Sequence, residues 1–184
     1  MNKKKLSVQS VVAIGIGTAI LFLLKRWVSI PIGIPNTNLD TSYGFLGFIA
    51  VLFGPAVGFC VGFLGHSIND FTQFGTPWWT WVFTTGLVGM AMGFLKKYIQ
   101  PDEGKISTRK LVFYNIYQVI INIIAWVLIA PTGDVLIYSE PANKVYLQGI
   151  VSAFTNSLST GVIGTILLVI YASTKVQKGS LKKE

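Results

Sequence analysis

The 184-residue chain is poor in charge, cysteine and histidine. Only 12% of its residues are charged, well below the ~25% typical of soluble domains, whereas 52% are hydrophobic and the mean hydropathy is +0.60. So few charges cannot cover a water-exposed surface, and so high a hydrophobic content excludes an intrinsically disordered chain. The single cysteine, Cys60, excludes an internal disulfide, and the single histidine, His66, excludes a multi-histidine metal site.

Motifs of the common enzyme classes are also missing. The sequence contains no phosphate-binding loop, no HExxH, no GxSxG and no CxxC. We therefore expect neither an enzyme nor a chain that binds a cofactor or metal of its own. The formal net charge of +8 indicates basic flanks on the cytoplasmic side of a membrane, rather than nucleic-acid binding.

Long apolar segments predict an all-α membrane protein: one domain, 1–184, folded as a compact bundle of six transmembrane helices. The first segment ends in Lys25-Arg26-Trp27 instead of a small-residue cleavage site, which favours a retained helix over a signal peptide. The second and third are short and are separated by Gly54-Pro55, so they form either a tight hairpin or one Pro-kinked span. The predicted helices cover residues 6–27, 43–53, 55–70, 78–95, 110–130 and 145–171.

The distribution of basic residues decides between these two readings. Twelve of the 15 lysines and arginines lie at the N-terminus, in the segment 96–110 or at the C-terminus. All twelve fall on one side only if Gly54-Pro55 is a turn and the chain crosses six times. The positive-inside rule then predicts a multi-pass cell-membrane protein with both termini in the cytoplasm. Lys25, Arg26 and Lys144 remain outside, where we expect them at the interface or paired with Asp40, Asp134 or Glu140.

Polar side chains recur at membrane depth on one face of each of three predicted helices. Such groups are costly unless they are paired or hydrated. Three amide-rich stripes favour a wet cavity for a neutral polar organic ligand, and the alternative for each residue is hydrogen bonding between helices. The stripes contain Asn115, Gln118, Asn122 and Trp126; Gln148, Ser152, Asn156 and Ser159; and His66, Asn69, Asp70 and Gln73.

Aromatic and small residues add two further candidate surfaces. Trp78 and Trp79 open the fourth predicted helix, either as an interfacial belt or as a stacking wall for a flat ligand. The first helix carries Ala13/Gly17 and Gly15/Ala19. These small-xxx-small pairs allow close approach of another helix, from a partner or from the same bundle.

Four stretches of the chain carry a family resemblance: VVAIGIGTAI, IPNTNLDTSY, FGPAVGFCVGFLGHSINDF and GTPWWTWV. They resemble the substrate-binding S components of energy-coupling factor (ECF) vitamin transporters, and most closely a lactobacillal subfamily linked to cobalamin. The resemblance implies capture of a vitamin from outside, in a cavity roofed by the loop 29–42. Cobalamin or cobinamide is the expected substrate, and cobalt enters only as part of it.

The same resemblance implies partners and a site. A transmembrane T component and two ATP-binding-cassette ATPases, which use the ATP, would carry the S component through a toppling motion, with docking through Ala13, Gly15, Gly17 and Ala19. The alternatives are another vitamin, such as riboflavin or a thiamine precursor, and a small non-transporting membrane assembly protein. The expected substrate-binding residues are Asn36, Asn38, Tyr43, His66, Asn69, Asp70, Trp78, Trp79, Gln118, Asn122, Trp126, Gln148 and Ser152.

Overall fold

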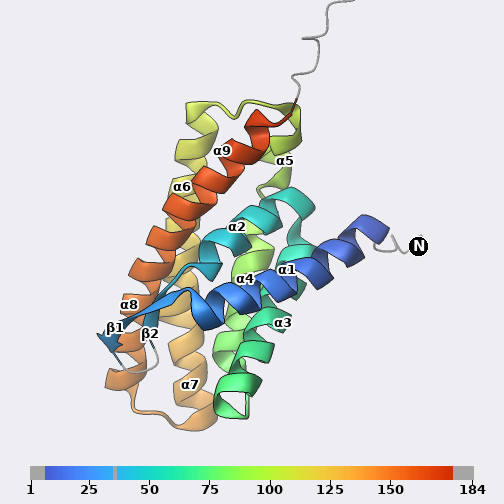
Figure 1. The fold of residues 1–184 in the computed structure, drawn as a ribbon. Coiled ribbons are helices and arrows are strands. Elements are labelled where there is room, and N and C mark those ends of the chain that lie inside the picture. Colours follow the sequence, from blue (N-terminus) through green and yellow to red (C-terminus); the bar gives the residue numbers. More distant parts are fainter. Residues whose placement is uncertain (1–6, 35–36, 176–184) are drawn as a thin grey trace, which may run out of the picture.

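The computed structural model describes residues 7–34 and 37–175, which are almost wholly helical (Figure 1). Asn36 and the lysines at positions 3–5 lie outside the described residues. In chain order the elements are α1 (Val8–Trp27), β1 (Ser29–Ile34), β2 (Thr37–Asp40), α2 (Ser42–Phe53), α3 (Pro55–Phe74), α4 (Trp79–Gly93), α5 (Lys96–Ile99), the 3-10 helix η1 (Pro101–Glu103), α6 (Thr108–Ile123), the π-helix η2 (Ile124–Ile129), α7 (Ala130–Tyr138), α8 (Ala142–Ser159), the π-helix η3 (Thr160–Gly164) and α9 (Thr165–Ser173).

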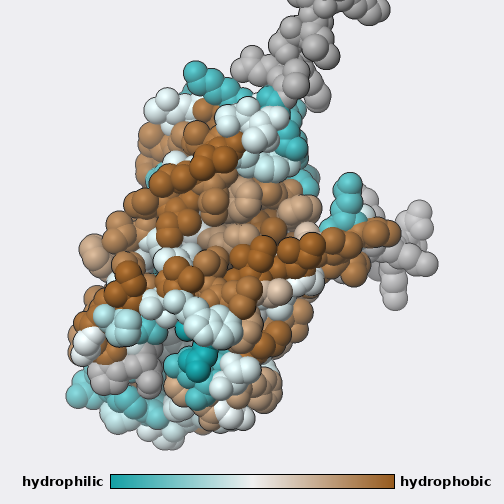
Figure 2. Space-filling model, in the orientation of Figure 1, coloured by the Kyte–Doolittle hydropathy of each residue, from teal (hydrophilic) through white to brown (hydrophobic). Residues whose placement is uncertain are grey.

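Within the described residues, three continuous helices are long and apolar enough to cross a membrane. They run over Val8–Trp27, Thr108–Tyr138 and Ala142–Ser173, and the second and third each continue through a π-helical turn. On the face drawn in Figure 2, a broad band of hydrophobic residues separates hydrophilic residues at the two ends. These features confirm a mostly helical membrane protein. The count of six crossings and the side of the termini stay predictions.

The turn expected at Gly54-Pro55 is present. The helix α2 ends at Phe53, and Gly54 has a φ of 98°, a left-handed conformation that costs glycine little. Pro55 then starts α3 at its first position, where the missing backbone N–H breaks no helical hydrogen bond. Two separate helices therefore replace the alternative of one kinked span.

Three sequence-based expectations were wrong in detail. The third helix is not short, because α3 continues through its polar residues to Phe74 and has 20 residues. The loop 29–42 contains an antiparallel hairpin of β1 and β2, with Ser29 opposite Asp40, so the fold is not purely helical. The helix expected to end at 130 continues to Tyr138, because the wide π-helical turn η2 precedes Pro131 and accommodates the proline.

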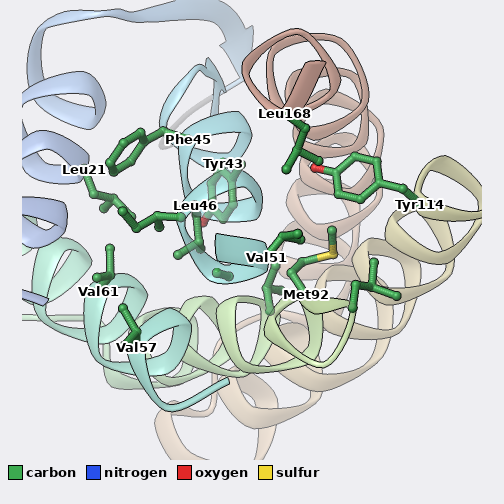
Figure 3. Packing of buried hydrophobic residues seen from close by; sticks show 14 of the residues in the cluster. Leu21, Tyr43, Phe45, Leu46, Val51, Val57, Val61, Met92, Tyr114 and Leu168 are labelled. Atoms are coloured by element: carbon green, nitrogen blue, oxygen red, sulfur yellow. The ribbon is translucent and has the colours of Figure 1, made fainter. Parts of the chain in front are cut away.

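The core is built around the 12-residue α2. Leu46, Ala50 and Val51 of this helix are fully buried, and Figure 3 shows Leu46 and Val51 among side chains contributed by several other helices. α3 and α4 touch through their backbones, because a Cβ atom on Gly58 would lie 2.2 Å from the carbonyl oxygen of Gly89. Any side chain there would push the two helices apart.

The described basic residues of the predicted cytoplasmic loop gather at one end of the bundle. Lys96 and Lys97 lie on α5, and Arg109 and Lys110 lie at the start of α6. The hairpin and the end of α7 lie at the opposite end (Figure 1). The molecule thus has a basic end and a hairpin end, separated by the length of the two long helices.

Candidate ligand-binding site

A pocket of about 450 Å³ lies at the hairpin end of the bundle. Its volume falls within the range of about 300–1,000 Å³ usual for small-molecule sites. Side chains from α1, β2, α2, α3, α4, η2, α7 and α8 line it, so it collects segments from most of the chain. Nine predicted substrate-binding residues line the pocket: Asn38, Tyr43, His66, Asn69, Asp70, Trp78, Trp126, Gln148 and Ser152.

Aromatic rings form one wall of the pocket. Trp81 and Trp126 stack with ring centroids 5.7 Å apart and an angle of 18° between their planes. Tyr43 meets Trp126 edge to face at 5.3 Å. Trp126 is only 1% exposed and therefore holds Trp81 in place, whereas the half-buried ring of Trp81 is the part of the wall that a ligand can reach.

A chain of buried amides holds Trp126 from behind. Its indole N–H donates to Oδ1 of Asn122 at 2.9 Å, and the amide of Asn122 donates in turn to Oε1 of Gln118 at 3.0 Å. Gln118 donates to the backbone oxygen of Ser157 on α8 at 3.1 Å. The structure therefore places Gln118 and Asn122 in hydrogen bonds that orient the wall, outside the pocket lining.

A second hydrogen-bonded group joins α2, α3 and α4 on the pocket's inner side. The Nδ1 atom of His66 lies 2.7 Å from the hydroxyl of Thr85, which also bonds the hydroxyl of Tyr43 at 3.0 Å. The Nε2 atom of His66 lies 3.3 Å from the carboxylate of Asp70, which accepts a bond from the backbone N–H of Trp78 at 3.1 Å. Both ring nitrogens of His66 are thus engaged by protein groups.

An ion pair ties the hairpin to α1. The ammonium of Lys25 lies 2.6 Å from Oδ2 of Asp40, and the backbone N–H of Ser42 donates to Oδ1 at 2.9 Å. Burial by itself raises the pKa of Asp40, but the charge of Lys25 and these hydrogen bonds outweigh it and hold the pKa below its ordinary value. The carboxylate of Asp40 is therefore ionised, and its pair with Lys25 fastens the end of β2 over the pocket.

Two more carboxylates face the pocket near its mouth. Asp134 of α7 is buried and accepts hydrogen bonds from the hydroxyl of Thr80 and from the indole N–H of Trp81, the latter at 2.6 Å. Glu140 pairs with Lys144 at 2.8 Å. The expected pairing of the outer lysines is confirmed for Lys25 with Asp40 and for Lys144 with Glu140.

Trp79 was expected to bind the substrate, but the structure places Trp81 in the pocket lining and Trp79 outside it. Trp79 is 45% exposed and packs on Phe63 and Phe71 at the outside of the bundle, away from the pocket lining. Trp81 is the ring that lines the pocket. Helical spacing carried this signal, because residues three or four apart share a face and Trp81 shares one with Trp78 and Thr85.

Other pocket residues were not among the predicted set, chiefly charged and amide groups. Their signal was weaker, because an acidic residue in a loop is indistinguishable in sequence from a solvated one until the chain folds. Those with polar side chains are Lys25, Thr37, Asp40, Gln73, Thr76, Trp81, Asp134, Glu140, Lys144 and Asn156. In the described residues, no group of three or more His, Cys, Asp or Glu side chains is arranged to hold a metal ion.

The four small residues of α1 divide between two faces. Ala13 and Gly17 are buried within the chain, and a Cβ atom on Gly17 would lie 2.9 Å from the Val61 side chain on α3. Gly15 and Ala19 are exposed, and a Cβ atom on Gly15 would meet nothing within 4 Å. The structure thus uses Ala13 and Gly17 for packing within the bundle and leaves Gly15 and Ala19 free for an outside contact.

The fold and the pocket together define a class: a small helical membrane protein with a pocket of ligand size at one end and no nucleotide-hydrolysis motif in its sequence. A family model described as "ECF-type riboflavin transporter, S component" matches residues 5–173. The chain belongs to this family of transporter S components, which is not an enzyme family. Membership implies a T component and ATPase subunits as partners.

Bacterial relatives extend over the full length of the chain. A protein named "UPF0397 protein" from Lacticaseibacillus casei strain BL23 is 66% identical over 183 residues, covering 100% of this chain and 98% of the relative. Proteins of the same name from Staphylococcus aureus strain Newman and Lactiplantibacillus plantarum are 52% and 51% identical, and both alignments cover 100% of this chain. Their names state no ligand.

Proposed function

We propose that this chain captures a vitamin from the outer side of the membrane and delivers it inward after docking on a T component driven by two ATP-binding-cassette ATPases. The observation that carries the proposal is the pocket itself, which lies under the hairpin at the end opposite the basic loop. With the basic loop in the cytoplasm, the pocket faces outward. The chain has no motif for hydrolysing nucleotides, so transport depends on its partners.

For the substrate, the pocket volume favours a molecule about the size of a flavin. Its volume of about 450 Å³ lies in the lower half of the usual range. The half-buried ring of Trp81, which is stacked on Trp126, supplies a flat surface against which an isoalloxazine ring can pack. Riboflavin is also the vitamin in the description of the matching family model.

A corrinoid is the second candidate, and the polar lining favours it. Cobalamin and cobinamide carry several amide arms, whose N–H groups match the carboxylates of Asp40, Asp70 and Asp134 around the pocket. A corrinoid is larger than a flavin and needs more room than about 450 Å³, so this substrate would have to extend out of the pocket or widen it. Because both nitrogens of His66 are engaged, recognition would come through the arms and not through a bond from His66 to cobalt.

Binding is tested by titrating the purified chain with riboflavin and, separately, with dicyanocobinamide while tryptophan fluorescence is recorded. We expect saturable quenching by one of them. Trp81→Leu should weaken binding at least about tenfold, since an aromatic wall contributes its buried area and ring contacts. Trp79→Leu is the matched control on the outer surface and should bind normally. Equal effects of both variants, or no binding of either compound, would contradict the proposal.

Transport is tested by uptake of the radiolabelled ligand into cells or proteoliposomes. Uptake should require coexpressed T and ATPase subunits, and the chain should copurify with them. A chain that copurifies with no ATPase and supports no uptake would instead be the small membrane assembly protein considered above. Mass spectrometry of any small molecule that copurifies identifies the ligand without a prior choice.

A further inference from the structure

One buried polar atom in the pocket has no hydrogen-bond partner. The side-chain oxygen Oδ1 of Asn69 is buried and contacts no donor among the described residues, although Asn69 is only 4% exposed and lines the pocket. A buried acceptor left unpaired costs roughly 1–3 kcal/mol. Because Asn69 lines the pocket, a small rotation of its side chain would let this oxygen accept a hydrogen bond from a ligand.

The neighbouring carboxylate fixes which end of the Asn69 amide is left without a partner. The Nδ2 atom of Asn69 donates to Oδ1 of Asp70 at 3.3 Å, and Asp70 also receives the backbone N–H of Trp78. An ionised carboxylate only accepts hydrogen bonds, so turning the amide over would set oxygen against oxygen. The free group of Asn69 is consequently the carbonyl oxygen, an acceptor.

The charged groups around the pocket point to the same ligand chemistry. Four carboxylates and two lysines line it, and each lysine already has an acidic partner: Lys25 is paired with Asp40, and Lys144 with Glu140. Asp70 and Asp134 are buried and have no lysine partner among the described residues. An anionic ligand group would meet excess negative charge and, within the described part of the chain, no uncommitted ammonium.

We infer that the pocket selects vitamins, and chemical forms of a vitamin, that present N–H or O–H donors and no negative charge to its inner end, with Asn69 as a specificity-determining acceptor. This inference rests on the proposed function. It assigns a donor class to the ligand: imide, primary amide or hydroxyl groups. It also predicts weaker binding of forms that present a phosphate monoester or a carboxylate to that end, even where the ring system is the same.

Matched pairs of compounds test the charge selection on the unaltered protein. Riboflavin is compared with its 5′-phosphate, and cobinamide, with its amide arms, with cobyrinic acid, in which carboxylates replace them. Dissociation constants come from tryptophan quenching at pH 7. We expect the anionic member of the bound pair to bind at least about tenfold more weakly. Equal or tighter binding of the anionic member overturns the inference while leaving vitamin capture intact.

Substitution of the acceptor tests the role of Asn69. Asn69→Leu keeps the approximate size and removes the amide, and we expect about tenfold weaker binding of the neutral compound. Asn115→Leu is the amide control, because Asn115 bonds Leu111 and Thr165 outside this pocket. Melting temperatures show whether each variant folds. If Asn69→Leu does not fold, the compound pairs on the unaltered protein still test the charge selection. Unchanged affinity in folded Asn69→Leu overturns the assignment of Asn69 as the acceptor. If the unaltered protein binds none of the compounds, the inference and the vitamin-binding function fall together.

Discussion

Removal of the Lys25 ammonium isolates the charge that fastens the hairpin. In Lys25→Met the carboxylate of Asp40 stays buried at 5% exposure but loses the partner that lies 2.6 Å away. The methionine keeps most of the length and the apolar stem of the lysine. The hydrogen bond from the Ser42 N–H remains, so the change is confined to one charge.

The expected cost has an upper limit set by proton uptake. Breaking a buried ion pair by removing one partner typically costs about 3–5 kcal/mol. Asp40 can avoid an unpaired buried charge by binding a proton. Protonating a carboxyl group of ordinary pKa, ~3.9, at pH 7 costs about 4 kcal/mol, and this sets the upper limit. We therefore expect Lys25→Met to destabilise the folded chain by about 3–4 kcal/mol at pH 7. By the scaling for chains of this size, the melting temperature falls by roughly 6–16 °C.

The pH dependence of this loss has a defined sign. Asp40 has a lowered pKa in the folded protein, so its pair with Lys25 contributes fully above the unfolded pKa and is lost as the pH falls through the folded value. In Lys25→Met, burial raises the pKa of Asp40, and protonation relieves the unpaired charge. The difference in melting temperature between the two proteins should be full at pH 7 and shrink toward pH 4.

Thermal unfolding in detergent, followed by circular dichroism, provides the measurement. The double variant Lys25→Met/Asp40→Asn removes both charges and should recover at least half of the loss. A double variant as unstable as the single one, or a single variant that melts like the unaltered protein at pH 7, would refute the argument that this ion pair holds the hairpin.

Three further outcomes are expected from other parts of the chain. Gly58→Ala should lower the free energy of unfolding by about 1–3 kcal/mol, because its Cβ would lie 2.2 Å from the Gly89 carbonyl oxygen. Gly15→Ala is the control and should leave the melting temperature unchanged or slightly raised. Equal melting temperatures of the two variants would contradict the close contact. Gly15→Trp should abolish copurification with the T component while the isolated chain keeps its melting temperature and its ligand binding; an intact complex would move the docking surface off this face of α1. Orientation is tested by cysteine labelling in a Cys60→Ala background. Ile137→Cys should react with a membrane-impermeant maleimide in intact cells, and Lys105→Cys only after the cells are permeabilised. The reverse pattern would place the pocket on the cytoplasmic side.

Much of the helical layout follows from simple patterns in the sequence. Apolar runs and the basic loop were enough to place the first helix and the turn at Gly54-Pro55. The end of the fifth helix was misplaced because Pro131 normally stops a helix, and nothing in the sequence announces the π-helical turn that lets it continue. The hairpin was missed since its strands are short and β1 is mostly exposed.

The candidate site was partly predictable for a similar reason. Helical spacing brought His66, Asn69 and Asp70 to one side of α3, and all three line the pocket. Spacing alone could not separate Gln118, which bonds Ser157 across two helices, from Gln148, which lines the pocket. That distinction depends on how the helices rotate against one another, which is set by packing and not by the pattern of one helix.

The contact between Gly58 and Gly89 has a consequence for how the pocket can open. Two helices that meet backbone to backbone slide or separate only with difficulty, so α3 and α4 move as one body. The α3–α4 pair carries His66 and Asp70 on one helix and Trp81 on the other. We therefore expect it to form the rigid side of the site. The hairpin is joined to α1 by the Lys25–Asp40 ion pair and rests against α8, so we expect it, rather than the α3–α4 pair, to be displaced when the pocket opens.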